Sequence, residues 1–441
     1  MAGPGGFSHF TTNWSRYHPR LHEVKRAAGK YFLSHPQRPT NTRYKQALTS
    51  AAADFKLRSS VFPLHINDSI RQFKNVDRSP GLPYTQRGFK RKDEVNPIII
   101  KQYVHHLKYG HYDRCNTPCT AAVKTMVSKR DKFRLIWVYP AHMTFAEGMF
   151  AAPLIRAYTE QRGKYGLWIN YAKGDMRTLM ASRHKRNLWL GADWSGYDAS
   201  VPAWIIRDAF DILRSQLDFS HYAEWGSPTD SNTLPLLWDR IIKYFINTPL
   251  RFQDGTVIRK RRGVPSGSYF TSLVDSVVGC VVWHYLLGDS ATQNRWYVGD
   301  DALIEVNRSV DIQKVASEAK TTFSMTLNVE KSSLGTHVAF LGYTMGRDGR
   351  PQADLHKLVA QLVLPSRPDR TFLDFCSRAR ALQLSCFGLG CWIFTTQVQS
   401  FLDDHAPNFQ PTLHSRDELM TKLVALDLAH WPPLNSVMRR V

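Results

Sequence analysis

The spacing of hydrophobic and polar positions predicts both strands and helices in this chain of 441 residues. The runs 187–190 and 297–306 are rich in β-prone residues, and a Gly-Asp turn interrupts the second, which predicts a strand and, later, a hairpin. Another β-like run with alternating basic residues starts at Lys132. We expect a helix near residue 200, capped by the Ser200 hydroxyl and with Pro202 in its first turn. Its apolar face consists of Ile205, Ala209, Ile212 and Leu213.

The two ends of the chain carry no recognisable chemistry. Residues 1–75 are polar, aromatic and basic, with scattered helical periodicity. After residue 347 the pattern is helical, and a capping box at 415–418 predicts a late helix. One helical face there consists of Leu355, Leu358, Val359, Leu362 and Val363. The longest apolar run, 277–287, is short of the ~20 residues that a membrane span requires, so we expect no membrane insertion.

Two carboxylate clusters follow predicted strands. Asp300 and Asp301 are adjacent at the hairpin turn, and Asp193 and Asp198 follow the strand at 187–190. Neighbouring ionised carboxylates repel each other, which is costly unless a cation lies between them. Gly-Asp is also ordinary turn chemistry, so the pair alone does not define a site. If Asp193 and Asp300 meet, they form an oxygen-lined site for a pair of Mg²⁺ ions.

The order of the motifs around these carboxylates is more specific than any one of them. Between the clusters lies Gly263-Val264-Pro265-Ser266-Gly267-Ser268-Tyr269-Phe270-Thr271, followed by Asp275, and after the hairpin come Glu330-Lys331-Ser332 and Phe340-Leu341-Gly342-Tyr343. Upstream stand Ser79-Pro80-Gly81-Leu82-Pro83, Lys132-Phe133-Arg134 and Phe145-Ala146-Glu147-Gly148. This ordered set resembles viral RNA-dependent RNA polymerases, with the partitivirus branch of double-stranded RNA viruses closest in pattern and picobirnavirus polymerases similar. The resemblance spans residues 78 to about 346.

The resemblance implies an α+β right-hand fold with fingers, an antiparallel palm sheet and a helical thumb. It implies an N-terminal extension and fingers over 1–188, a palm over 189–346 with a fingers insertion at about 215–260, and a thumb over 347–441. The implied activity is template-directed RNA synthesis from ribonucleoside triphosphates by two Mg²⁺ ions, for which Mn²⁺ can substitute. RNA template and product and ribonucleoside triphosphates are the implied partners. A viral capsid protein is a candidate partner, and the implied location is the host cytoplasm, inside the virion.

Each motif has an expected role. Asp193 and Asp300 are the expected metal ligands, with Asp301 as a weaker one because it need not face the same ions. Lys331 matches a lysine thought to protonate the departing pyrophosphate, although a solvated surface lysine is the alternative. The expected nucleotide-binding residues are Lys132 and Arg134 for the triphosphate, Ser266 and Gly267 under the nascent base pair, and Asp198, Thr271 and Asp275 at the ribose 2′-hydroxyl. Whether Asp198 contacts the ribose directly or through Asp275 is left open.

The positive charge of the chain predicts a polyanionic partner. Lys and Arg number 58 against 37 Asp and Glu, a formal net charge of +21. The expected RNA-binding residues are Ser79, Gly81, Lys124, Lys129, Arg130, Arg261 and Arg262. The alternatives are an ordinary connector at 78–84 and a solvated basic face or localisation signal at 259–262.

The cysteines and the N-terminus exclude some classes. Six cysteines show no zinc-ribbon spacing, and a chain of this size does not need disulfides, so we expect free thiols and a reducing compartment. His111, Cys115 and Cys119 are a weak metal-binding alternative. The first residues do not form a signal peptide.

Three rival functions explain part of the pattern. A reverse transcriptase would share the paired aspartates but would not need Asp275. A basic RNA-packaging protein explains the charge but not the ordered carboxylates, and a metal-dependent nuclease or phosphatase explains the carboxylates but not the basic segments.

Overall fold

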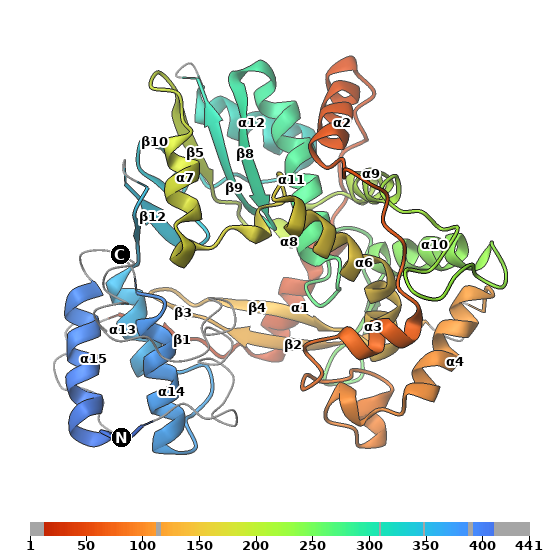
Figure 1. Ribbon diagram of the computed structural model, residues 1–441, viewed down its shortest axis with the longest axis horizontal. Helices are drawn as coiled ribbons and strands as arrows, with labels where there is room; N and C mark the ends of the chain where they lie inside the picture. The colour runs from red at the N-terminus through yellow and green to blue at the C-terminus, as the bar shows by residue number, and fades with distance from the viewer. Residues whose placement is uncertain (1–12, 112–115, 308–309, 347–348, 387–390, 410–441) are drawn as a thin grey trace.

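The structure is a computed structural model that describes residues 13–111, 116–307, 310–346, 349–386 and 391–409. Helices and sheets are both abundant, as the α+β prediction requires (Figure 1). The helix expected after the capping box at 415–418 lies outside the described residues.

A four-stranded antiparallel sheet, here called the central sheet, has the strand order β10-β5-β9-β8. Its strands are β5 (Leu188–Ala192), β8 (Ala291–Val298), β9 (Asp301–Val306) and β10 (Ser333–Gly335). β8 and β9 form the predicted hairpin, in which Val298 pairs with Asp301, and Ala192 at the end of β5 pairs with Ala302. This register brings Asp193 and the hairpin turn to the same edge of the sheet.

Side chains of the central sheet alternate between two apolar cores, because successive residues of a strand point to opposite faces. Leu190 and Ile304 contribute to the large core that contains helix α11 (Thr271–Leu287). Trp189 and Leu303 pack in a smaller core with Met176 and Met180, at α7 (Asp175–Ala181). Both faces of β5 and β9 are therefore covered, which fixes the strands that end at the carboxylates.

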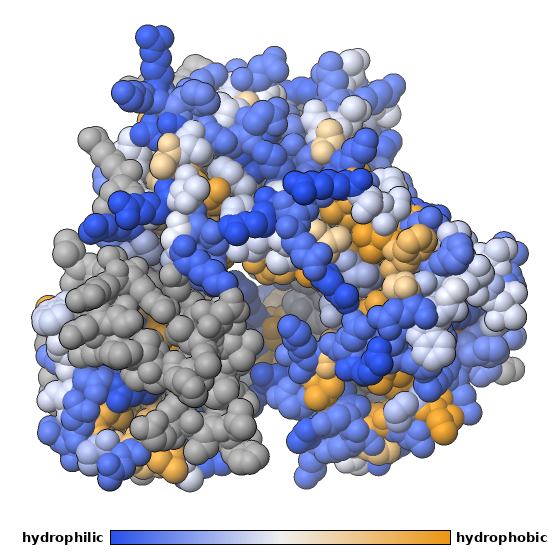
Figure 2. All heavy atoms as spheres, viewed as in Figure 1, coloured by the Kyte–Doolittle hydropathy of each residue, from blue (hydrophilic) through white to orange (hydrophobic). Residues whose placement is uncertain are grey.

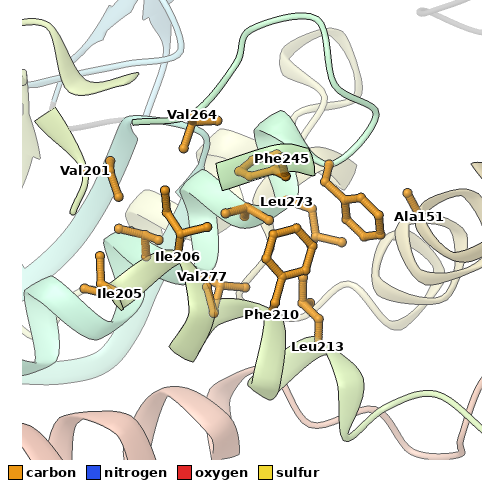
Figure 3. Close-up of a cluster of buried hydrophobic side chains, with 14 of the residues drawn as sticks. Ala151, Val201, Ile205, Ile206, Phe210, Leu213, Phe245, Val264, Leu273 and Val277 are labelled. Carbon is orange, nitrogen blue, oxygen red and sulfur yellow. The ribbon is translucent and has the colours of Figure 1, made fainter. Parts of the chain in front are cut away.

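Helix α11 runs through the large core. The segment Thr271–Ser290 is long and apolar enough to cross a membrane, but 78% of its apolar window is buried inside this structure, as in a core helix. Figure 3 shows Leu273 and Val277 of α11 beside Phe210 of α9 (Ala203–Arg214). Further helices that contribute to this core include α2 (Thr42–Asp54), α6 (Ala141–Gln161), α10 (Thr233–Ile246) and α12 (Ile312–Phe323).

The helix expected near residue 200 exists, but its predicted cap was wrong. Helix α9 begins at Ala203 with Pro202 at the N-cap, whereas the Ser200 hydroxyl donates to Tyr197 O at 2.8 Å and closes the short α8 (Tyr197–Ser200). The φ of proline suits a helix start without a side-chain cap. The predicted apolar face is confirmed, since Ile205, Ala209, Ile212 and Leu213 are all buried.

A second sheet contains the predicted strand that starts near Lys132. Its order is β4-β2-β6-β7, and its strands are β2 (Cys119–Thr125), β4 (Phe133–Val138), β6 (Pro249–Arg251) and β7 (Val257–Arg259). A small pair, β1 (Ser15–Arg16) and β3 (Val127–Ser128), extends beside it. Helices α1 (Leu21–Gly29), α3 (Ile66–Gln72) and α4 (Pro97–Lys108) complete the N-terminal part.

The C-terminal helices have a small core of their own. They are α13 (Leu355–Val363), α14 (Phe372–Gln383) and α15 (Cys391–His405), and they follow β11 (Val338–Phe340), β12 (Tyr343–Met345) and β13 (Pro351–Gln352). Leu358, Val359 and Leu362 are buried as predicted, whereas Val363 is exposed at the end of its helix. Figure 2 shows a hollow on this face of the molecule, beside the lobe that contains α3 and α4.

The cysteine prediction needs one correction. Cys119, Cys280 and Cys376 are buried free thiols, as expected, but Cys386 is disulfide-bonded. Cys115 of the alternative metal set lies outside the described residues, and the thiol of Cys119 contacts Tyr244 Oη at 3.5 Å.

Candidate active site

Two strand ends bring three carboxylates together at one edge of the central sheet. Asp193 follows β5, and Asp300 and Asp301 close the β8–β9 hairpin. Burial raises the pKa of Asp193, the positive charges of Lys331 and Lys132 oppose that shift, and the charge of Asp300 adds to it. Burial and the charges of Asp300 and Asp193 raise the pKa of Asp301 to about 7. The carboxylates thus lie close enough for each charge to act on the next.

The donor set at this edge suits a hard divalent cation. Among the described residues, no donor hydrogen-bonds to the side chain of Asp193 or Asp301. Oxygen-only ligands of this kind favour Mg²⁺ or Mn²⁺ over softer metals. The three aspartates are spaced more widely than a preformed cage for one ion, because their oxygens do not all lie within 4.8 Å of one another. Bound divalent cations would neutralise the repulsion that raises these pKa values.

Lys331 reaches the carboxylates because its segment hydrogen-bonds to the residue after β5. Asn328 N donates to Asp193 O at 2.8 Å, and Asp193 N donates to Ser332 Oγ at 3.0 Å. Lys331 is exposed on the turn between these contacts. The structure therefore places Lys331 near Asp193, one of the residues expected to bind metal.

The second sheet adds further cations to the same region. The pKa of Lys132 is lowered by burial, then by the charges of Lys331 and Arg134, while Asp193 opposes the shift. Arg134 in turn opposes the raised pKa values of Asp198 and Asp301. Lys124 is the cross-strand partner of Arg134, so these two side chains lie on one face of the β2–β4 pair. The sequence did not predict Lys357 of α13, which also acts on Lys132 and Asp301.

Asp198 and Asp275 form a second, deeper carboxylate pair. Burial, followed by the charge of Asp300, raises the pKa of Asp198 to about 6. Asp275, in α11, is only 3% exposed, and burial and the charges of Asp198 and Asp300 raise its pKa well above the usual range. The Oδ1 atom of Asp275 is buried without a hydrogen-bond partner. Such an unsatisfied acceptor in a carboxylate cluster is typical of a site that binds a ligand.

The 263–271 loop packs against β4, and residues of the loop expected to bind nucleotide also make contacts that hold the loop in place. A Cβ on Gly267 would lie 1.7 Å from Trp137 O, so packing against β4 already requires glycine here, and its place under a base pair stays a prediction. Ser266 Oγ donates to Leu135 O at 3.2 Å. The Thr271 hydroxyl donates to Pro265 O and Ser268 O, both at 2.9 Å, so its observed contacts hold the loop at the start of α11.

Glu147 also holds this loop, and sequence reasoning assigned it no role. Its fully buried carboxylate accepts from Ser268 Oγ and Tyr269 N, both at 2.7 Å. Burial raises the pKa of Glu147 to about 8, although these two hydrogen bonds oppose the shift. A glutamate within the largely apolar run that became α6 was the available signal, because a buried carboxylate must find donors.

Several of the residues expected to bind RNA have structural contacts instead. Gly81 is buried with a φ of +67°, and a Cβ there would lie 2.5 Å from Tyr139 O, so its loop packs against the chain. Ser79 Oγ accepts from Gly81 N at 3.3 Å. Arg262 is 4% exposed and donates to Ser34 O and Ser200 O. For Gly81 and Arg262 the predicted RNA contact was wrong, because their polar or backbone groups face the interior.

The remaining basic candidates face solvent. Arg261 is exposed next to the buried Arg262, and Lys129 and Arg130 are exposed between β3 and β4. Lys129 Nζ lies 5.7 Å from the centre of the Trp14 ring. These three side chains are accessible from solvent, and their contact with RNA stays a prediction.

A separate titratable cluster lies behind the hairpin. Among the described residues, Asp54, Cys280 and His284 are the set whose ligand atoms all lie within 4.8 Å of one another. Arg295 NH1 lies 3.1 Å from His284 Nδ1, and His284 Nε2 lies 2.9 Å from Asp54 Oδ2. The guanidinium already balances the Asp54 charge, so the geometry is that of a buried ion-pair network joining α2, α11 and β8.

Two solved structures share this arrangement of elements. The RNA-dependent RNA polymerase of a human picobirnavirus aligns with a TM-score of 0.72 and 15% sequence identity, covering 96% of this chain and 84% of that one. Its insertion-loop deletion mutant aligns with a TM-score of 0.68, also at 15% identity, covering 87% and 76%. The fold is therefore that of a viral RNA-dependent RNA polymerase.

Sequence comparison supplies the family. The model of the viral RNA-dependent RNA polymerase family matches residues 15–372, so the chain belongs to that family. The RNA-directed RNA polymerase of Cryptosporidium parvum virus 1 (strain KSU-1) is 27% identical over 390 residues, covering 80% of this chain and 70% of that protein. That of Atkinsonella hypoxylon virus (isolate 2H) is 26% identical over 315 residues, covering 59% and 47%. The predicted resemblance is confirmed.

Proposed function

We propose that this chain replicates and transcribes a viral RNA genome, by adding ribonucleotides to a growing strand opposite an RNA template and releasing pyrophosphate. The proposal rests on the edge of the central sheet where Asp193, Asp300 and Asp301 come together. The cations near these carboxylates are Lys132, Arg134 and Lys331. Carboxylates beside cations, with no ion pair between them among the described residues, suit a substrate that brings metal ions and phosphates together.

The regions take the names of a right hand in this proposal. Residues 189–346 form the palm around the central sheet, with a fingers insertion at about 215–260. Residues 1–188 form the N-terminal extension and fingers, and residues 347–441 the thumb. A cavity of about 650 Å³ between β2–β4 and the start of α14 supports a channel there, since Arg78, Lys124 and Arg367 line it. RNA or nucleotide phosphates would pass these side chains.

Asp193 and Asp300 would hold two Mg²⁺ ions, with Asp301 as an additional ligand. Bound there, the ions would activate the 3′-hydroxyl and stabilise the charge on the leaving pyrophosphate. Arg134 can bind triphosphate oxygens in a bidentate manner, with Lys132 beside it. Lys331 can donate a proton to the departing pyrophosphate, because its ammonium lies on the turn next to Asp193.

The ribose would be read by the deeper carboxylates. The unsatisfied Oδ1 of Asp275 offers an acceptor to a 2′-hydroxyl, either directly or through Asp198. Deoxyribonucleotides lack that donor and would leave the acceptor unpaired. This expectation separates the proposal from reverse transcription.

The proposed setting is the host cytoplasm inside the virion, with the capsid protein as a candidate partner. The test is a Mg²⁺-dependent incorporation assay on a primed RNA template, with ribonucleotides and deoxyribonucleotides offered in parallel. We expect incorporation of ribonucleotides that EDTA abolishes. Preferred use of deoxyribonucleotides, or cleavage of RNA without synthesis, would overturn the proposal in favour of a reverse transcriptase or a nuclease.

A further inference from the structure

A second basic pocket lies away from the carboxylates, between α3 and α4. Its volume is about 460 Å³, and its wall contains Lys101, Lys108, His65, His105 and His106 but no carboxylate. None of the residues assigned above to metal or nucleotide lines this pocket. In Figure 1, α3 and α4 lie on the opposite side of β2 and β4 from the C-terminal helices.

Lys108 is a cation in this pocket for which the described residues provide no carboxylate partner. Its Nζ donates to Tyr222 Oη at 2.9 Å and lies 5.2 Å from the centre of the same ring. Burial alone lowers the pKa of Lys108 to about 8, and no neighbouring charge opposes that shift. A half-buried ammonium without a carboxylate partner is costly, and an anionic ligand would offset that cost.

Unsatisfied polar atoms lie on the same wall. His106 Nδ1 and Asn67 Oδ1 are buried without a hydrogen-bond partner among the described residues. His65 Nδ1 accepts from Asn67 N at 3.3 Å, which leaves Nε2 of that ring as the nitrogen able to donate. Asn67 Oδ1 can only accept, so the donor on this wall is His65 Nε2, beside the positive charges of Lys101 and Lys108.

An exposed, immobilised indole stands next to the pocket. Trp225 is 53% exposed, yet its Nε1 donates to Asp68 Oδ2 at 2.6 Å and one face of its ring stacks on His65 at 4.5 Å. His65 also contacts the ring of Tyr222, the partner of Lys108. The carboxylate of Asp68 is paired with Arg71, and so is the nearby Glu224. The other face of Trp225 is available, held in place before any ligand binds.

We propose that Trp225 and the α3–α4 pocket form a second binding site for single-stranded RNA, with a base stacked on the indole and a neighbouring phosphate in the pocket. This inference rests on the proposed function, since it takes the substrate to be RNA. Stacking on an exposed aromatic combined with lysines along the backbone is how proteins bind single strands without reading sequence. The site would hold the strand outside the catalytic edge.

The test measures binding of a labelled single-stranded oligoribonucleotide to the full chain, without nucleotide or metal. Trp225→Ser should weaken binding about five- to a hundred-fold, while Trp225→Phe should retain most of it. Lys101→Glu should weaken binding. It should also reduce the slope of log affinity against log salt concentration by about 1 or more. Lys45→Glu, at an exposed lysine of α2, makes the same charge change elsewhere and should leave the affinity unchanged.

Three outcomes would overturn the site. The first is wild-type affinity in Trp225→Ser and Lys101→Glu. The second is equal binding of double-stranded RNA through the same residues. The third is a Trp225- and Lys101-dependent signal that inorganic phosphate or a nucleoside triphosphate reproduces as well as the oligomer, because the pocket would then serve a free phosphate compound.

Extension by one nucleotide on a short primed template keeps this result separate from the proposed function. The Trp225 and Lys101 variants should extend that template at the wild-type rate and lose efficiency only when the single-stranded overhang is long. If the wild-type chain binds the oligomer through Trp225 but extends no primer, the polymerase proposal fails and the site stands. If the wild type extends primers but the Trp225 variants bind the oligomer with wild-type affinity, the site fails and the polymerase proposal stands.

Discussion

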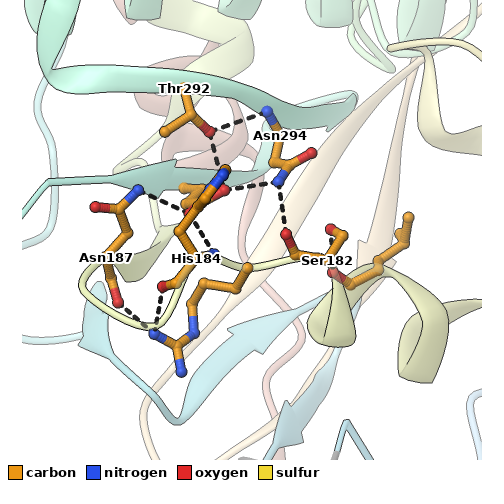
Figure 4. Close-up of polar contacts among 8 residues, drawn as sticks. Ser182, His184, Asn187, Thr292 and Asn294 are labelled. Atoms are coloured by element: carbon orange, nitrogen blue, oxygen red, sulfur yellow. Dashed lines mark hydrogen bonds and ion pairs between the residues drawn. The ribbon is translucent and has the colours of Figure 1, made fainter.

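Strand β9 carries a half-buried carboxylate, Asp301, at one end and a buried one, Glu305, near the other, in opposite conditions. At one end, Glu305 has a fully buried side chain that accepts hydrogen bonds from His184 N, Asn187 Nδ2, Thr292 Oγ1 and Asn294 Nδ2 at 2.7–3.0 Å (Figure 4). Burial would raise the pKa of Glu305, but these hydrogen bonds outweigh it and lower the pKa. At the other end, no donor in the described part of the chain hydrogen-bonds to the side chain of Asp301, and its pKa is raised to about 7.

The difference separates a carboxylate with a structural role from one proposed to bind metal on the same strand. Asp301 and Glu305 lie four residues apart and thus on the same face, so strand geometry does not distinguish them. What distinguishes the two carboxylates is the number of hydrogen-bond donors around each. A charge that the fold satisfies stabilises the fold, whereas a cluster of unsatisfied charges has its energy lowered only when a ligand binds.

The largest effect is expected at the unsatisfied end. Asp300→Asn or Asp193→Asn should lower the rate of nucleotide incorporation by at least about a thousand-fold, because each removes a charged metal ligand. Stability should stay near that of the wild type or rise, since one repulsive charge is gone. Rates from single-turnover extension and the midpoint of urea unfolding would measure the two effects. Near-normal synthesis by folded Asp300→Asn would contradict the site assignment.

Glu305→Ala should show the converse result. Removing the acceptor leaves several buried donors unpaired, with an expected loss of about 3 kcal/mol in the free energy of unfolding. The folded fraction should still incorporate nucleotides at close to the wild-type rate. Because the folded-state pKa of Glu305 is lowered, its stabilisation is present above the unfolded pKa and is lost as the pH falls through the folded pKa. Urea unfolding across acidic pH, with Glu305→Gln as the control lacking that titration, would measure this dependence.

Local pattern predicted the strand ends at the candidate catalytic edge but not their surroundings. Apolar runs ending at Asp193 and Asp300 were visible because strand, turn and carboxylate are consecutive in the chain. The donors to Glu305 come from up to 121 residues away, and so does the Ser268 contact of Glu147. Arg262 was misassigned for the same reason, since a basic run does not reveal which of its members finds buried carbonyl partners.

Asp275→Ala tests whether an unsatisfied acceptor reads the substrate. It should reduce the preference for a ribonucleotide over its deoxy analogue by about ten- to a hundred-fold, because the 2′-hydroxyl loses a buried partner. Use of the ribonucleotide should fall while use of the deoxyribonucleotide stays nearly constant. Asp275→Asn should be milder, since its amide oxygen still accepts. An unchanged ratio of kcat/KM values in Asp275→Ala would assign the carboxylate to the structure of α11.

Glu147 combines features of both ends, because it is hydrogen-bonded and yet has a raised pKa. Glu147→Ala should lower kcat about tenfold by freeing the 263–271 loop, and Glu147→Gln should recover most of it. In the folded chain the pKa of Glu147 is raised to about 8 from the usual 4.5, so the unfolded chain loses this proton at a lower pH than the folded chain does. The wild type therefore loses stability as the pH rises between those values. Glu147→Gln should lack that component. Unfolding midpoints of the two proteins that run parallel between pH 5 and 8 would contradict the assignment.

The smallest expected effect, stabilisation by Mg²⁺, compares the two ends directly. A divalent ion that binds only the folded chain raises the free energy of unfolding by about 1.4 kcal/mol at ten times its dissociation constant. The wild type and Glu305→Gln should gain equal increments, since Glu305 already has its donors and offers nothing to an ion. Asp300→Asn should gain less, because it has lost both a ligand and the repulsion that the ion relieves. Thermal unfolding of the three proteins with and without Mg²⁺ measures the increments. Equal gains in all three would place the stabilising ion elsewhere and remove the physical reason for treating the hairpin end as the metal site.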